Sequence, residues 1–317
     1  MASPEALPDT NKKSSKASRI LKLLAKIGIT VLCFWYISTK INFREAFDVI
    51  RKANWLLLFL ALLIFVLSKF FSALRLNIYF RNIKIRLSEW ANIRLYWLGM
   101  FYNLFIPGAI SGDVYKVILL NRRYKTSYKK TSSAVLLDRF SGVLALAVIL
   151  AIYGMTVLKN QLYYVILIAG TILAIAGFYF VVRFLFKDFI SGFLSTFLWS
   201  LAVQISQVIC IYIIMKSLGI PLNQHEWIFI FLASAIITVL PISLGGGLGT
   251  RELVFVEGAR SFHLDPETGV TISLIFYLVT VAGSLPGLYF VFHNPLDLDS
   301  KIANNEQESQ KEKNIVK

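Results

Sequence analysis

Cysteine, histidine and acidic residues are scarce in this sequence, and each scarcity argues against a class of function. The chain contains 2 cysteines and 3 histidines in 317 residues. Cys33 and Cys210 lie far apart inside apolar stretches, so the sequence predicts neither a disulfide framework nor a zinc site. The histidines are isolated, and no nucleotide-binding loop, nucleophile elbow or HExxH motif occurs. We therefore expect no metal, no cofactor and no catalytic residues.

The shortage of acidic residues leaves the chain strongly basic, with 33 Lys and Arg against 18 Asp and Glu and a net charge of +15. On a soluble protein this excess would suggest a nucleic-acid partner. However, 56% of the residues are hydrophobic and the mean hydropathy is +0.65, which excludes an ordinary soluble domain. The basic clusters fall near residues 12–19, 81–86 and 122–130. The positive-inside rule places these clusters in the cytoplasm, and we expect no nucleic-acid partner.

Long apolar runs predict an all-α, polytopic membrane helix bundle in the plasma (inner) membrane. Each run approaches or exceeds the roughly 20 residues that cross a bilayer as a helix. About six full spans are expected, near residues 21–39, 54–78, 134–157, 162–182, 195–217 and 268–292. Both termini would then be cytoplasmic. We expect a polar tail at residues 1–19, the membrane domain at 20–293 and a disordered tail at 294–317.

Two further apolar segments, at about residues 90–120 and 226–260, are interrupted in the same way. Each begins near a Glu-Trp pair, runs to a turn with proline and glycine, and resumes as a short apolar stretch. Irregular backbone at membrane depth is tolerated only where protein buries it or it lines a wet cavity. The two segments follow loops on opposite sides of the membrane. The sequence therefore predicts two re-entrant helical hairpins in an inverted-repeat arrangement, as at transport sites.

The first interruption ends in Gly112 and Asp113 and is followed by Lys116. We expect Asp113 to cap the next half-helix, whose free N–H groups would point into the protein and attract a phosphate. Lys116 would add a positive charge one turn later. The alternative is structural: Asp113 merely caps the helix, and Lys116 extends to the cytoplasmic surface.

The second interruption is richer in glycine, with Gly246 and Gly247 preceding Thr250, Arg251 and Glu252. Successive glycine N–H groups can form an anion-holding concavity. Thr250 is a candidate N-cap, Arg251 offers a forked donor suited to phosphate, and Glu252 would balance its charge. The alternative is a buried ion pair that only shapes the tip of the hairpin.

Polar and charged side chains also lie inside the predicted spans. Ser200, Gln204 and Gln207 share one helical face, which fits either a cavity wall or hydrogen bonding between helices. Unpaired charges are costly in a membrane, so we expect a structural charge pair between Arg75 and Asp138, with Arg139 beside it. Lys69 is explained by snorkelling to the membrane surface.

These motifs resemble the flippase-type membrane domain of the lysylphosphatidylglycerol synthase family, which includes uncharacterised bacterial and archaeal membrane proteins. The resemblance covers nearly the whole chain, and Ser111 departs from it because the family usually has glycine there. It rests on Asn103, Pro107-Gly108, Gly112 to Lys116, Asp138-Arg139 and Pro241 to Glu252. Members of that family are associated with moving lipids between leaflets, so the resemblance implies lipid transport. In multiple peptide resistance factors a soluble aminoacyl transferase follows this domain; this chain stops at Lys317, so lysine transfer is not expected.

The leading hypothesis is therefore a lipid flippase. The headgroup of a phospholipid or polyprenyl phosphate would cross a polar cavity between the hairpin tips, with Asn103, Gln204 and Gln207 in its lining. Nothing in the sequence supplies ATP hydrolysis, so transport would be passive or coupled to an ion gradient. One alternative is a membrane-embedded transferase that uses Asp113 and Glu252. The other is a non-catalytic membrane partner of a separately encoded glycosyltransferase or synthase.

Overall fold

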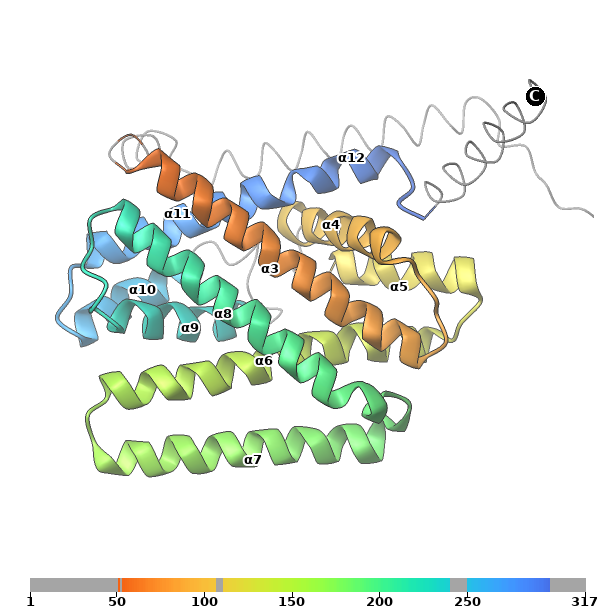
Figure 1. Cartoon of the computed structure of the whole chain (residues 1–317), viewed down its shortest axis with the longest axis horizontal. Helices are drawn as coiled ribbons and strands as arrows, with labels where there is room; N and C mark the ends of the chain where they lie inside the picture. The colour runs from red at the N-terminus through yellow and green to blue at the C-terminus, as the bar shows by residue number, and fades with distance from the viewer. Residues whose placement is uncertain (1–50, 52, 107–110, 240–249, 297–317) are drawn as a thin grey trace, which may run out of the picture.

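The computed structural model describes residue 51 and residues 53–106, 111–239 and 250–296. Across these ranges the chain forms helices and no strand, which confirms the predicted all-α class. The elements, shown in Figure 1, are α3 (Trp55–Asn82), α4 (Glu89–Phe105), α5 (Ser111–Tyr124), α6 (Tyr128–Val157), α7 (Gln161–Leu185), the short 3₁₀ helix η1 (Lys187–Gly192), α8 (Phe193–Ser217), α9 (Glu226–Val239), α10 (Thr250–Ser261), α11 (Pro266–Ser284) and α12 (Pro286–Phe292).

Five helical stretches in the described ranges are long and apolar enough to cross a membrane, so the protein is a multi-pass membrane protein. They correspond to five of the six expected spans; the remaining one, near residues 21–39, lies outside the described residues, as do residues 1–19 and 297–317. The five are Trp55–Asn82, Tyr128–Val157, Gln161–Leu185, Lys187–Ser217 and Pro266–Phe292. The last is interrupted at Leu285, directly before Pro286, because proline cannot donate the backbone hydrogen bond that a continuous helix needs.

Short polar side chains fix where several helices begin, because the first N–H groups of a helix have no partner within it. The Oδ1 atom of Asn54 accepts hydrogen bonds from the N–H groups that start α3, and Asn160 does the same for α7. Ser88 caps α4 through a 3.1 Å bond from the N–H of Ala91. Asp265 caps α11, and its hydrogen bonds from Thr268 hold the pKa of its carboxyl below the usual range.

The two interrupted segments form helical hairpins, α4–α5 and α9–α10, that enter the bundle from opposite ends (Figure 1). Their first helices begin at Glu89 and Glu226, the repeated Glu-Trp positions. At 1.5 Å per residue the four helices are about 18–26 Å long, shorter than the roughly 30 Å hydrocarbon core. Each hairpin must therefore turn back within the membrane. The turns themselves, residues 107–110 and 240–249, lie outside the described residues.

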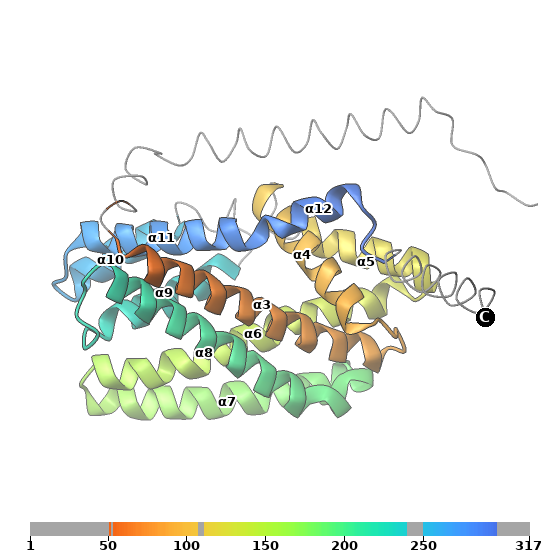
Figure 2. The same ribbon diagram turned by 45° about the horizontal axis from the view of Figure 1, so that its top comes forward.

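The bundle packs around two main apolar clusters, which include residues toward opposite ends of α3, the helix that runs through the middle of Figure 2. One brings together side chains of α8, α9, α10 and α11 with parts of α3 and α6, and it includes the buried side chains of Trp227 and Phe255. The other joins α3, α4 and α6 near η1 and includes Phe80 and Leu95. Helix α7 lies at the edge of the bundle, with only 6% of its apolar window buried. The region between the two clusters is where the polar side chains of α3, α6 and α8 gather.

Basic residues are concentrated at the end of the bundle that holds the α3–α4 and α5–α6 loops, which we call the basic end (Figure 1). In the described residues of these loops and the adjoining helix termini they are Arg81, Lys84, Arg86, Arg122, Arg123, Lys125, Lys129 and Lys130. At the opposite end the described connections and adjoining helix termini contribute Arg51, Lys159, Lys216 and Arg260. Basic residues are therefore more numerous at the end that the positive-inside rule assigns to the cytoplasm.

Candidate functional site

A polar cavity lies inside the bundle, where the two hairpins approach each other. It consists of two adjoining pockets of about 230 and 210 Å³ that share Lys69, Met100, Asn103, Arg139 and Val239. Val239 is the last residue of α9, and Asn103 lies two residues before the end of α4. The described ends of both hairpins therefore line one cavity. Gly246 and Gly247, expected to hold phosphate, lie outside the described residues.

The cavity is rich in charge. Its described lining includes four cations and two carboxylates, a formal excess of two positive charges, contributed by Lys69, Arg75, Lys116, Arg139, Asp113 and Asp138. All six belong to α3, α5 or α6, and α6 packs against both of the other two helices. Because the hydration that stabilises a charge in water is largely absent at membrane depth, such a cluster must be held by pairing, by water or by an ionic ligand.

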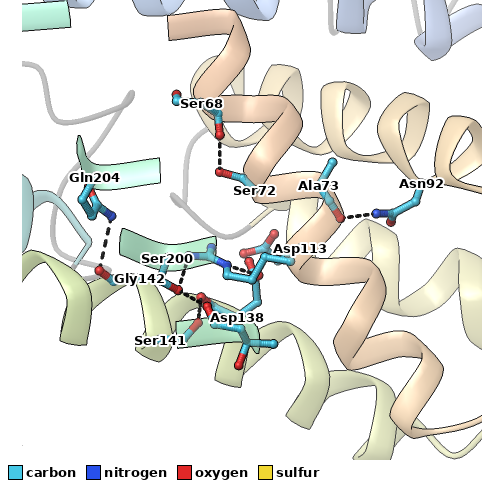
Figure 3. Close-up of polar contacts among 12 residues, drawn as sticks. Ser68, Ser72, Ala73, Asn92, Asp113, Asp138, Ser141, Gly142, Ser200 and Gln204 are labelled. Atoms are coloured by element: carbon cyan, nitrogen blue, oxygen red, sulfur yellow. Dashed lines mark hydrogen bonds and ion pairs between the residues drawn. The ribbon is translucent and has the colours of Figure 1, made fainter. Parts of the chain in front are cut away.

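Arg75 and Asp138 form the buried ion pair that the sequence predicted. The Nε atom of Arg75 donates to Oδ1 of Asp138 at 2.7 Å, and both side chains are at most one-tenth exposed. Arg75 also donates to the Oγ atom of Ser200 at 2.9 Å, so the pair connects α3, α6 and α8 (Figure 3). Ser200 thus serves hydrogen bonding between helices, which was one of the two interpretations of its helical face.

Asp113 has a different role from the one expected. Helix α5 begins at Ser111, so Asp113 lies inside the first turn rather than at the N-cap. Its carboxylate accepts from Nζ of Lys116 at 3.0 Å and from Nε of Arg139 at 2.5 Å. Arg139, for which no partner was predicted, lines the same cavity as Arg75 and Asp138 and is paired with Asp113. One carboxylate bridges two cations, because side chains three residues apart on a helix are neighbours and α6 packs beside α5.

Asn103 performs the capping that was assigned to Asp113. Its Oδ1 atom accepts a 2.8 Å hydrogen bond from the N–H of Gly112, while the hydroxyl of Ser111 donates to the carbonyl of Tyr102. The N–H of Gly112, in the first turn of α5, is thus occupied within the hairpin, so the prediction that Gly112 offers a free anion-binding donor was wrong. Asn103 still lines the cavity, as expected.

The hairpin α4–α5 is closed by a glycine contact that leaves no room for a side chain. A Cβ atom placed on Gly112 would overlap the carbonyl oxygen of Gly99, and one on Gly99 would overlap the side chain of Lys116. Gly112→Ala is therefore expected to lower the free energy of unfolding by about 1–3 kcal/mol, the usual range for overpacking. Thermal unfolding of the detergent-solubilised protein measures this change.

The matched control for that substitution is Gly177→Ala on α7, where the added Cβ meets nothing within 4 Å. Alanine favours a helix over glycine, so the control should unfold at the same or a higher temperature. Equal unfolding temperatures for Gly112→Ala and the unmodified protein would contradict the close contact.

Lys69 is the cavity residue that sequence reasoning missed. It lies 14 residues from the first residue of α3 and 13 from the last, so at 1.5 Å per residue it is about 20 Å from either end. That is too far for snorkelling, and the earlier explanation was wrong. Instead its Nζ atom faces the cavity, 4.4 Å from the ring centroid of Phe65. In the described part of the chain no carboxylate lies within salt-bridge distance of it.

Gln204 and Gln207 both line the cavity, as expected. The Nε2 atom of Gln204 donates to the carbonyl of Gly142 at 3.3 Å, which links α8 to α6 (Figure 3). Its Oε1 atom is buried and accepts no hydrogen bond from any residue that the structure describes. A buried acceptor left in this state costs free energy, so a ligand or water that donates to it would be stabilised there.

Arg251 and Glu252 lie outside the lining of this cavity. Arg251 is 7% exposed, and its guanidinium carbon lies 5.0 Å from the centroid of Phe276. Phe276 in turn contacts Phe65 edge-on at 5.9 Å. Arg251 thus packs on a ring that contacts Phe65, a residue of the cavity lining. Glu252 accepts a 3.1 Å hydrogen bond from Ser273, so both side chains contact α11.

Ligands for a metal do not gather in the part of the chain that the structure describes: no group of three or more His, Cys, Asp or Glu side chains lies close enough to hold an ion. The arrangement of the cavity suits a different kind of ligand. Two ammonium groups and two guanidinium groups converge on a space that amide side chains also line. Such donors match the oxygens of a phosphate group.

Comparison with known proteins gives a consistent result. The chain is 22% identical to the UPF0104 membrane protein PH1989 of Pyrococcus horikoshii, over 83% of this chain and 95% of that protein. No solved structure matches the chain. The family described as the lysylphosphatidylglycerol synthase TM region matches residues 23–287. Because this match covers most of the chain, the protein belongs to the lysylphosphatidylglycerol synthase transmembrane-region family.

Proposed function

We propose that this protein moves a phosphate-bearing lipid between the two leaflets of the plasma (inner) membrane. The observation that carries the proposal is the formal excess of two positive charges in the described lining of the polar cavity. Charge at membrane depth is costly, and a lipid phosphate is an anion that can reach it without leaving the membrane. The headgroup would cross through the cavity while its hydrocarbon chains stay in lipid.

Lys69 and Arg139 are the proposed phosphate-binding residues. Lys69 has no carboxylate within reach among the described residues, and the guanidinium of Arg139 can bind two phosphate oxygens at once. Lys116 keeps the charge of Asp113 balanced. Asn103, Gln204 and Gln207 would hydrogen-bond the polar part of the headgroup. A role in phosphate binding for Gly246, Gly247, Arg251 and Glu252 stays a prediction about the second hairpin tip.

The chemistry of the cavity fits both a glycerophospholipid and a polyprenyl phosphate, because each presents a phosphate at the membrane surface. The name of the family favours a phosphatidylglycerol-type lipid as the first probe. By the positive-inside rule the basic end would face the cytoplasm. The lipid would then enter from that side and leave on the other, or move in both directions if transport is passive.

Vesicles that contain the purified protein test the proposal. Phosphatidylglycerol with a fluorescent headgroup-proximal label is placed in both leaflets, and a reductant that cannot cross the membrane destroys the label outside. We expect the protected inner fraction to become accessible in protein-containing vesicles and to stay protected in empty ones. The measurement is made without a gradient and with an imposed proton or sodium gradient, so that passive and coupled transport are both covered.

The same samples separate the competing functions. A leak control with an entrapped soluble dye identifies broken vesicles. If the label stays protected under every gradient and mass spectrometry finds a chemically altered lipid, the protein is a transferase. If the lipid neither moves nor changes, the flippase proposal fails and the role of a membrane partner for a separate glycosyltransferase or synthase becomes the better explanation.

A further inference from the structure

An apolar groove runs between α5 and α6 on the outer side of the polar cavity. Its volume is about 370 Å³, and its lining combines valine, isoleucine and leucine side chains, among them Val117 and Leu136, with Tyr128 and Ser132. Leu136 is 45% exposed, so the groove opens to the surface of the bundle. Asp113 and Arg139 complete the lining.

Asp113 and Arg139 therefore belong to both spaces, since they also line the polar cavity. Their ion pair stands between a space lined by charge and one lined by hydrocarbon. Each residue lies 11 positions from the loop-side end of its helix, at Tyr124 or Tyr128. At 1.5 Å per residue this is about 16 Å, or one leaflet of a roughly 30 Å hydrocarbon core.

We propose that the α5–α6 groove is a lateral portal that holds the acyl chain of a glycerophospholipid while its phosphate lies in the polar cavity, and that the Asp113–Arg139 ion pair closes this portal. The inference rests on the proposed function. It adds the route by which a lipid enters the cavity from the side and the contact that opens to admit it. We choose a glycerophospholipid as the occupant because its acyl chain fits the apolar groove and its phosphate fits the adjoining polar cavity.

The ion pairing around Asp113 explains how the portal opens without leaving a bare charge in the membrane. Asp113 contacts Lys116 with one carboxylate oxygen and Arg139 with the other. When a phosphate arrives, Arg139 can transfer to it, and Asp113 keeps Lys116 as its partner. We expect Arg139 rather than Lys116 to leave Asp113, because the side chain of Arg139 is 25% exposed, whereas that of Lys116 is 5% exposed. Each charge is then paired before and after the exchange.

Photo-cross-linking tests where the acyl chain of the lipid lies. The full-length protein in vesicles is exposed to phosphatidylglycerol that carries a diazirine on its acyl chain, and in parallel to a diacylglycerol with the same chains and no phosphate. Peptides of α5 and α6 are expected to be labelled at least fivefold more by the phosphatidylglycerol probe. Peptides of α7, whose apolar side chains face lipid, should be labelled equally by both. Equal labelling of the groove by the two probes would overturn the portal.

A groove-filling variant gives the second arm. Leu136→Trp is expected to reduce that preferential labelling and to slow lipid transport at least tenfold, with Leu173→Trp on the lipid-facing side of α7 as the matched control. Leu136 is exposed, so the larger ring does not crowd the core. Transport and labelling that are unchanged in Leu136→Trp would refute the portal. If the unmodified protein moves no lipid but still shows phosphate-dependent labelling, the proposed function fails and the groove assignment stands. If labelling of the groove were reduced by unlabelled polyprenyl phosphate but not by unlabelled phosphatidylglycerol, the acyl-chain assignment would be overturned.

Discussion

Lys69→Met is expected to abolish most lipid transport while leaving the fold as stable as before or more stable. Hydrogen bonds to charged groups contribute about 1.5–3 kcal/mol, so the loss of one phosphate contact corresponds to roughly a ten- to hundredfold lower rate. Methionine keeps the length and apolar body of the side chain. It also removes a charge that has no carboxylate within salt-bridge distance among the described residues, which should favour folding. The vesicle assay and thermal unfolding in detergent measure the two effects.

The opposite signs of the two effects make this substitution informative. Lys216→Met is the matched control, because Lys216 is exposed in the last turn of α8 and lies outside the cavity lining. It should change neither quantity. Transport at the unmodified rate in Lys69→Met would show that this ammonium group does not contact the lipid. A strong loss of stability would show instead that it serves the fold.

Asp138→Asn is expected to produce the largest loss of stability. Removing one member of a buried ion pair leaves the other charge uncompensated and typically costs about 3–5 kcal/mol. Arg75 would keep its hydrogen bond to Ser200 but lose its carboxylate partner. The unfolding transition in detergent should therefore move to much lower temperature or denaturant concentration. Asp188→Asn is the control, because its pair with Lys130 has both side chains about half exposed and such pairs contribute about 0–1 kcal/mol.

A double substitution distinguishes the value of the pair from the cost of breaking it. Replacing both members by apolar residues, Arg75→Met with Asp138→Leu, should recover much of the stability, because the desolvation cost of both charges disappears. A double-mutant cycle gives the coupling energy between them. If Asp138→Asn unfolded like the unmodified protein, Arg75 would have to be compensated by other groups in the cavity.

The architecture could be predicted from the sequence because lipid imposes strict conditions on length and polarity. A helix must be apolar for about 20 residues to cross, and a shorter run that contains a proline-glycine turn must return. Five expected spans and both hairpins follow from these two conditions. The repeated Glu-Trp pairs even marked the first residues of α4 and α9. Periodicity was not needed, since in a membrane the outer face is apolar as well.

The site was predicted less well, because the partner of a charged side chain depends on packing between helices. The Arg75–Asp138 pair could be expected from depth alone. By contrast, the Asp113–Arg139 pair joins residues 26 positions apart across the α5–α6 contact, and no local pattern indicates it. Capping was assigned to Asp113 because an acid follows the turn, whereas the side chain of Asn103, ten residues earlier, accepts from the N–H of Gly112 in the first turn of α5.

Two missed features did leave a signal in the sequence. Asp113 and Lys116 are three residues apart, which on a helix makes them neighbours, so their pairing was open to prediction. Lys69 lies 9 residues from the nearer end of the span expected at 54–78, which at 1.5 Å per residue is about 14 Å below the surface. The position of a charge along its span was therefore a better guide to the cavity than the glycine-rich turns.

The placement of α7 has a consequence for how this protein can diverge. With 6% of its apolar window buried, the helix leaves most of its surface uncovered, and it contacts the bundle along one side, through α6 and η1. Hydrocarbon tails do not discriminate among apolar side chains, so leucine, valine, isoleucine and phenylalanine are interchangeable there. Exchanges among these apolar side chains should therefore accumulate on the uncovered side of α7 at nearly neutral cost.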